Sequence, residues 1–349
     1  MTTGEDPSLG AYRALATFYN ALMTGLVLSL VTRHGPDVAR EFLFRHFRRQ
    51  HLQKFLPGLK KLGLEGQPDA VACALYHYHS NALGGVKTEY FRESDRKAWV
   101  RYPPPRWIWK GTAICAIPRE VNEAMLHGWH GHNGVSLGND RLGFVCTGQT
   151  VNGDPGLEGY YGEYDRPLAE HERVRFAPDE HMPFVAAAQQ PGLDTARWPA
   201  ERLHKAHRSY AMEYVRSFMP VLAAQLGTSE AMAEIGRTAR LIGLHYFEET
   251  AQQMGIDGAA TDAAAFGRYL AGLLAAQGEQ VRTEQLGTQT IVELAGWRLM
   301  HGIELSDEDV RRRAFEAWSE LWHGALAAFD RRRVLTVERD GETTRWRIT

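Results

Sequence analysis

The chain has 349 residues, of which 44% are hydrophobic and 23% charged, and its formal net charge is −2. These values are typical of a soluble globular protein with room for two domains of ordinary size. A charge this close to neutral argues against nucleic acid or an anionic membrane surface as the main partner. The apolar stretch at residues 21–31 is too short to cross a bilayer and its upstream flank is acidic, so we predict a cytoplasmic protein with no membrane-spanning helix.

The first half of the chain is predicted to form one module, residues 8–166, in which helices come before short strands. Gly35-Pro36 separates the first two helices, and Gly84-Gly85 ends the third. Pro118 opens a further helix, and a hairpin closes the module. The helices are expected at residues 8–31, 36–62, 68–83 and 118–132, and the strands at residues 86–91, 97–102, 142–147 and 157–164.

A degraded copy of this order closes the chain as a second module, residues 205–349, in which Trp318 falls on Trp129. Residues 167–204 between the copies are rich in proline and charge without periodicity, which is typical of a surface connector. The predicted fold class is therefore α+β, with two homologous modules. We expect each module to pack several helices on a small antiparallel sheet, and the two to form a pseudo-dimer.

Three polar side chains of the first module stand where the second copy has core residues. The pairs are His79 with Leu274, His132 with Leu321, and Glu158 with Trp346. Buried imidazole and carboxylate groups are unstable unless paired, and their pKa values move toward the range useful for proton transfer. We therefore expect all three to line a catalytic pocket, although satisfied core polar residues or a contact between modules would give the same pattern. His127 and His130 lie off that helix face and are expected on a wet surface.

Aromatic residues complete the expected pocket. Tyr78, Trp129 and Tyr160 would shape a slot for the substrate. Trp107 lies in a proline-stiffened loop that is either a lid over the site or a contact with the other module or a second subunit. Cys115 precedes the helix that starts at Pro118, where the helix dipole would lower the pKa of a thiol. It is a candidate nucleophile, with a small buried hydrophobe as the alternative.

Metal and cofactor signals are weak. His77 or His79 with His132 and Glu158 would suit a metal by ligand type, but no spacing fixes such a set. The sequence contains no G-x-S-x-G, no H-E-x-x-H, no G-K-[ST] phosphate loop and no G-x-G-x-x-G after a strand. We therefore expect no cofactor.

One family resemblance follows from the first module. Residues 93–102 read Glu-Ser-Asp-x-x-x-Trp-Val-Arg-Tyr, and they precede Cys115, Pro118 and the hairpin at residues 142–164. In this order residues 10–166, and more faintly residues 205–349, resemble the L-2-amino-thiazoline-4-carboxylic acid hydrolase-like family. They are also similar in outline to small-molecule sensor domains related to vinyl reductases. The first resemblance implies opening of a C–N or C–S bond in a small heterocycle.

These observations predict a hydrolase or lyase that acts on a small polar or heterocyclic molecule in the first module. His79 or His132 would be the general base toward water, and Glu158 would orient the imidazole or act as an acid. Two alternatives belong to other classes: a non-catalytic small-molecule-binding protein, and a homodimeric scaffold held together through Trp107 and Trp109. The expected partner is a small molecule, with a homo-oligomer as a further possibility.

Overall fold

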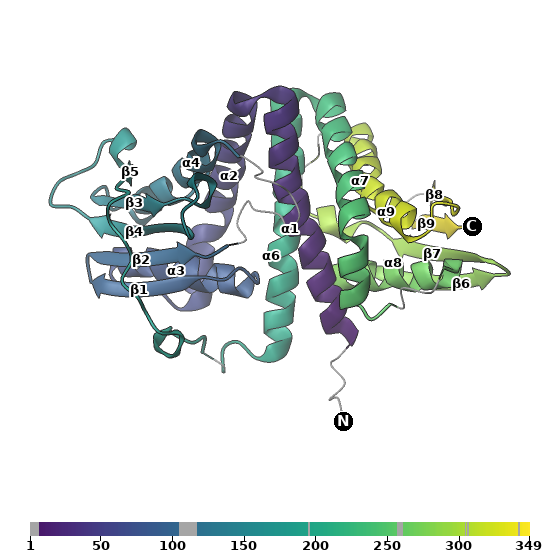
Figure 1. Ribbon diagram of the computed structural model, residues 1–349, viewed down its shortest axis with the longest axis horizontal. Helices are drawn as coiled ribbons and strands as arrows, with labels where there is room; N and C mark the ends of the chain where they lie inside the picture. The colour runs from purple at the N-terminus through teal and green to yellow at the C-terminus, as the bar shows by residue number, and fades with distance from the viewer. Residues whose placement is uncertain are drawn as a thin grey trace. The chain divides into compact units, whose positions relative to one another are not determined.

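The computed structural model describes residues 7–104, 117–194, 196–256, 261–303, 305, 307–340 and 343–349 (Figure 1). The chain divides into two compact units. The N-sheet unit comprises Val27–Leu203, and the C-sheet unit comprises the N-terminal residues up to Leu26 together with His204–Thr349. Each unit packs helices on one small sheet, so the predicted α+β class is confirmed.

The first helix, α1 (Pro7–His34), contributes its residues up to Leu26 to the C-sheet unit, whereas the sequence prediction assigned residues from 8 onward to the first module. Tyr19 shows the reason. Its hydroxyl accepts a hydrogen bond of 3.1 Å from Trp318 Nε1 and donates to the Gln277 side chain. These partners lie far away along the sequence, so the order of elements could not reveal the contact.

α1 is also the one helix, among the residues that the structure describes, that passes a length-and-composition test for a membrane span. The segment Leu9–His34 has a hydropathy of 1.7, although the sequence prediction found no such helix because polar residues interrupt it. Most of the apolar window, 67%, is buried inside the protein, and both core helices of soluble proteins and signal sequences pass the same test.

The helices of the N-sheet unit are α2 (Pro36–Leu62), α3 (Asp69–Leu83), α4 (Arg119–Gly128) and α5 (Asn133–Leu137). α2 ends at Gly63, whose φ of 73° lets its N–H bond the carbonyls of the last turn. α4 ends four residues before the predicted position. The Arg48 side chain donates to the carbonyls of His127 (3.0 Å) and Gly128 (2.9 Å), and the chain then continues as a 3₁₀ turn, η1 (His130–His132).

The sheet of this unit has the strand order β1-β2-β4-β3-β5. The strands are β1 (Glu89–Ser94), β2 (Lys97–Tyr102), β3 (Leu142–Gly148), β4 (Leu157–Glu163) and β5 (Val174–Phe176). β1 begins and ends three residues later than predicted. The turn to β2 is the two-residue Asp95-Arg96. The inner face of the sheet packs on α3: the rings of Tyr161 and His77 are 5.7 Å apart. Side chains of the other parity point to the outer face.

The segment predicted as a connector belongs to the N-sheet unit and lies against its sheet. β5 pairs in parallel with β3. The Gln190 amide bonds both the N–H (2.9 Å) and the carbonyl (3.2 Å) of Tyr90 on the edge strand β1. The Met182 N–H donates to the Glu158 carboxylate at 2.9 Å. This segment therefore covers part of the outer face, which the composition of the segment did not predict.

The C-sheet unit repeats the pattern with the strand order β6-β7-β9-β8. Its helices are α6 (Ala200–Leu226), α7 (Thr228–Gln253), α8 (Ala263–Gln277) and α9 (Glu308–Phe329). Its strands are β6 (Gln280–Leu286), β7 (Gln289–Ala295), β8 (Leu335–Asp340) and β9 (Thr343–Ile348). Trp318, Trp322 and Trp346 are fully buried and fill its core.

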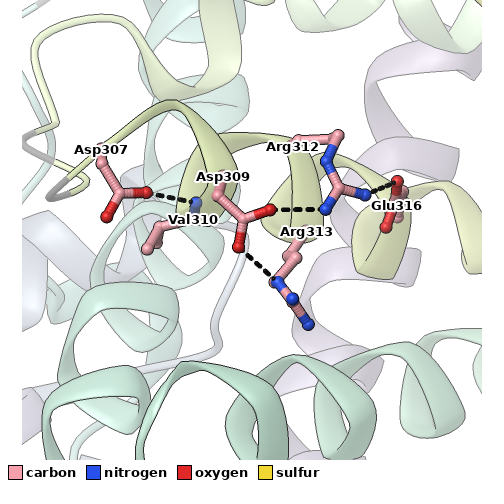
Figure 2. Close-up of polar contacts among 6 residues, drawn as sticks. All are labelled: Asp307, Asp309, Val310, Arg312, Arg313 and Glu316. Carbon is pink, nitrogen blue, oxygen red and sulfur yellow. Dashed lines mark hydrogen bonds and ion pairs between the residues drawn. The ribbon is translucent and has the colours of Figure 1, made fainter.

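The start of α9 is held by local charges (Figure 2). The Asp307 carboxylate accepts a hydrogen bond of 2.8 Å from the Val310 N–H, which is the side-chain cap expected at a helix N-terminus. Two residues later, Asp309 pairs with Arg312 and Arg313. These pairs mark the start of the helix. Because they are solvent-exposed, each stabilises it only slightly.

Candidate functional site

Glu158 and Tyr160 lie on the outer face of the sheet, away from α3. Their strand partners are Arg101 and Trp99, whereas Tyr161 pairs with Ala98 and faces the helices. Glu158 accepts hydrogen bonds from Thr147 Oγ1 (3.0 Å) and the Met182 N–H (2.9 Å) and lies 3.7 Å from the Arg101 guanidinium. The carboxylate is thus buried with its partners in place, in the manner of a structural residue.

The C-sheet unit has the same ion pair with the charges exchanged. Counted from the hairpin turns, Arg101 corresponds to Glu293 and Glu158 to Arg345, which pair at 2.8 Å. Glu158 therefore does not replace Trp346, as the sequence comparison assumed. A shift of one residue in the alignment of a strand assigns its side chains to the opposite face of the sheet. The sequence comparison made this shift, so it matched Glu158, which belongs to an outer ion pair, with a core position.

The helices α3 and α8 give a second correction of the same kind. Gly85 and Gly278 both have left-handed backbone just after these helices, with φ of 76° and 95°. Counted back from them, His77 corresponds to Leu270, and both side chains are buried. His79 falls on a glycine. The polar residue that replaces a core leucine in the N-sheet unit is therefore His77.

His79 and Tyr78 lie side by side on α3, with ring centres 4.9 Å apart. Burial lowers the pKa of His79 and raises that of Tyr78. Because both residues are on a helix of the inner face, the structure does not bring them together with Glu158 or Tyr160.

His132 lies in η1, so the helical-face comparison that selected it does not apply. Its ring is 5.2 Å from that of His51 on α2. Burial lowers the pKa of His132, and the cations Arg48 and Arg173 lower it further. Trp129 is its neighbour in sequence and also contacts His51, with ring centres 5.6 Å apart. The structure thus keeps His132 and Trp129 in one region of the unit.

Two predicted site residues, Cys115 and Trp107, lie outside the described residues. Among the residues that are described, no group of three or more histidine, cysteine, aspartate or glutamate side chains is arranged to hold a metal ion. The ligand set considered from the sequence, His79 with His132 and Glu158, does not assemble.

The structure gathers a different set of residues on the inner face, which we call the histidine–tyrosine cluster: Cys73, His77, His130, Asn133 and Tyr161. All five are buried, none more than 4% exposed. The rings of His77 and His130 stack with their centres 4.2 Å apart and their planes 14° apart. Such a concentration of polar groups is unusual in a sheet–helix core.

A chain of hydrogen bonds runs through the cluster. Asn133 Nδ2 donates to the Tyr161 hydroxyl at 3.0 Å, and that hydroxyl lies 2.7 Å from His130 Nδ1. The Tyr161 hydroxyl thus connects Asn133 with His130, and the tautomer of His130 determines which of the two groups donates in the second contact. Burial raises the pKa of Tyr161 and of the Cys73 thiol, so both stay protonated.

Aromatic rings from α2, α3 and the C-terminal end of α4 extend the cluster. Trp129 lies 5.9 Å from His77 and is stacked with Tyr76, at 25° between planes. His51 Nε2 is 2.8 Å from Ser136 Oγ. Burial, the nearby His132 and Arg48 lower the pKa of His51 to about 3. The His51 imidazole is therefore neutral at physiological pH.

Three buried polar atoms of this region have no hydrogen-bond partner. They are Trp129 Nε1, Asn133 Oδ1 and His51 Nδ1. An unsatisfied buried donor or acceptor costs about 1–3 kcal/mol. Unpartnered donors and acceptors thus lie around one set of rings.

Sequence reasoning missed His130 as a site residue and named His77 only as an alternative metal ligand. His130 was expected on a wet surface because the helix was extended to residue 132, but it is 4% exposed beneath Phe144 and Tyr161. The available signal was the pair of histidine-rich strings at residues 77–79 and 127–132. Which histidines of these two strings face the sheet depends on where α4 ends and on which side chains of β4 point toward the helices.

Comparison of the chain with models of protein families, with characterised proteins and with solved structures found no match.

Proposed function

We propose that the N-sheet unit binds a small molecule at the histidine–tyrosine cluster, without catalysis. The observation that carries this proposal is the set of unpartnered buried atoms, Trp129 Nε1, Asn133 Oδ1 and His51 Nδ1. They lie in a unit whose core keeps His77 and Tyr161 where the other unit has Leu270 and Ile348. Ligand sites of this kind combine apolar and aromatic walls with a few placed polar groups.

Binding is favoured over hydrolysis because Glu158 is on the opposite sheet face, where its Oε1 accepts two hydrogen bonds and its Oε2 lies 3.7 Å from Arg101. It cannot orient a histidine of the inner face. The resemblance of residues 10–166 to sensor domains related to vinyl reductases agrees with the binding proposal.

The test is a fragment screen by thermal shift on the full chain and on His77→Leu, which introduces the residue of the corresponding position. Compounds that stabilise the wild-type protein are expected to bind His77→Leu at least tenfold more weakly and His79→Leu equally well. Tyr161→Phe provides a second variant if His77→Leu does not fold. Equal binding to wild type, His77→Leu and Tyr161→Phe would contradict the proposal.

A hydrolase remains a second candidate because Ser136 Oγ lies 2.8 Å from His51 Nε2, a distance suited to a nucleophile and its base. A pKa of about 3 makes His51 a weak base, so this candidate ranks second. It predicts that Ser136→Ala abolishes turnover of an activated ester while binding of fragments is unchanged.

A further inference from the structure

We propose that the edge strand β6 (Gln280–Leu286) is an interaction surface for a second copy of this chain, and that the two β6 strands pair antiparallel about Thr283. The four-stranded sheets of two C-sheet units then form one continuous sheet. A two-fold interface of this kind must be self-complementary. The open edge of β6, its free backbone groups and its charges meet that requirement, independently of the binding function proposed for the N-sheet unit.

β6 is an open edge of its sheet (Figure 1). It pairs with β7 along all seven of its residues without a bulge. In the part of the chain that the structure describes, no group outside this hairpin bonds the backbone of β6. An open, regular edge is a template for another strand. The corresponding edge of the N-sheet unit is closed, because the Gln190 side chain bonds both the N–H and the carbonyl of Tyr90.

Both faces of β6 are accessible as well. The partner of Thr283 is Val292, which pairs with the core residue Trp346, so Thr283 points to the inner face of the sheet. Thr283 is nevertheless exposed, as are Arg282 and Glu284 on the outer face. A second strand can therefore approach β6 in the plane of the sheet.

The hairpin turn determines which backbone groups of β6 are free. Leu286 closes a two-residue turn whose first residue, Gly287, has a φ of 60°, as in a type I′ turn, so Leu286 is hydrogen-bonded to β7. Such pairs alternate along an antiparallel ladder, which directs the N–H and C=O groups of Val281, Thr283 and Gln285 away from β7. In a pairing about Thr283 these are the residues that face one another, so their free donors and acceptors match.

The charges of β6 select this register. Pairing about Thr283 places Arg282 of each copy opposite Glu284 of the other, at the positions where cross-strand side chains approach most closely. Pairing about Arg282 or about Glu284 sets like charges opposite each other, which is unfavourable. One register thus satisfies both the backbone and the side chains.

The same register continues a charge pattern of the sheet. One row of the outer face crosses all four strands with alternating sign: Arg282, Glu293, Arg345 and Glu338. The row ends at the open edge with the cation of Arg282. Glu284 of the second copy lies next in this row, so the alternation extends across the interface.

Sedimentation velocity of the full chain tests the pairing. One strand edge is a small interface, so we expect a dissociation constant of about 10–100 µM. Arg282→Glu and Glu284→Arg each set like charges opposite each other and should weaken the dimer at least tenfold. Combining the two substitutions exchanges the charges and should restore the wild-type constant. Arg331→Glu, at an exposed position before β8, makes the same change in net charge as Arg282→Glu and should leave the constant unchanged.

A mixture of the two single variants gives the sharpest result. The β6 strand of Arg282→Glu carries two acidic residues and that of Glu284→Arg two basic residues, so the mixture should form a heterodimer at a concentration where each variant alone is monomeric. Loss of the dimer in the single variants and its recovery in the mixture would support the pairing. A wild-type chain that stays monomeric, a dimer that tolerates both single substitutions, or a mixture that stays monomeric would overturn it.

Discussion

At the scale of single residues, hydrogen-bond partners distinguish a structural polar group from a site. Glu158 has a hydroxyl donor, a backbone donor and a nearby guanidinium, whereas Asn133 keeps an unpartnered oxygen in a fully buried position. Burial by itself does not separate the two, since both side chains are buried. The unpartnered atom indicates where a ligand is to be sought.

Replacement of Glu158 by alanine should destabilise the protein by about 3 kcal/mol, because it leaves Thr147, Met182 and Arg101 without their buried acceptor. The free energy of unfolding in urea measures this. Glu293→Ala, which removes the corresponding but more exposed ion pair, is the control and should cost about 1 kcal/mol or less. Equal costs for the two substitutions would contradict the structural role of Glu158.

The predicted residues show which part of the proposed site could be predicted from the sequence and which part could not. Pairing His79 and Glu158 with core residues of the second half required a comparison exact to one residue. The irregularity in β3 between Cys146 and Gly148, opposite Glu158, interrupts such a comparison, and the early end of α4 does the same for His132. The region around Trp129 and the histidine-rich strings was predicted, but the histidines that face the sheet were not.

At the scale of elements, α7 and α9 depend on glycine for their close packing. A Cβ at Gly243 would collide with the Leu321 carbonyl, and one at Gly324 with the Arg240 carbonyl. The backbones of the two helices are therefore in direct contact, and no flexible side chain can move aside.

Gly243→Ala should destabilise the protein by about 2 kcal/mol or more, because the added methyl group meets backbone atoms in a packed interface. Gly236→Ala on the same helix is the control. Its Cβ would have its nearest contact at 3.4 Å, and alanine favours a helix by about 1 kcal/mol over glycine, so this change should be neutral or stabilising. Thermal unfolding of both variants measures the difference, and equal melting temperatures would argue against the close approach.

Most elements could be predicted from the sequence because helical periodicity, Pro starts and Gly ends are local signals. Helices α2 and α3 and strand β2 lie close to their expected residues. The assignment of α1 to the C-sheet unit and the contacts of residues 174–190 with the sheet could not be predicted, since both depend on contacts between residues distant in sequence.

At the scale of the whole molecule, buried histidines link stability to pH. His46 and His51 are 0% and 1% exposed, and burial lowers the pKa of each to about 3. In the unfolded chain these imidazoles have the ordinary pKa of about 6.5. The folded state binds these protons more weakly than the unfolded chain does. The two neutral imidazoles therefore contribute fully to stability above about pH 6.5, and this contribution is lost as the pH falls toward 3.

The free energy of unfolding should fall by roughly 1.4 kcal/mol per pH unit for each of the two histidines below about pH 6. Urea denaturation of the full chain at pH 7, 6 and 5 measures the slope. His46→Leu, which suits the neighbouring rings of Phe42 and Phe47, should reduce the slope by about that amount. A variant with the slope of the wild-type protein would show that His46 is not buried as a neutral ring.

A crystal structure of the protein soaked with a stabilising fragment tests the proposed site most directly. We predict ligand density against His77, with hydrogen bonds to Trp129 Nε1 and Asn133 Oδ1. Density on the outer face of the sheet, beside Glu158 and Tyr160, would contradict the assignment of the site to the histidine–tyrosine cluster.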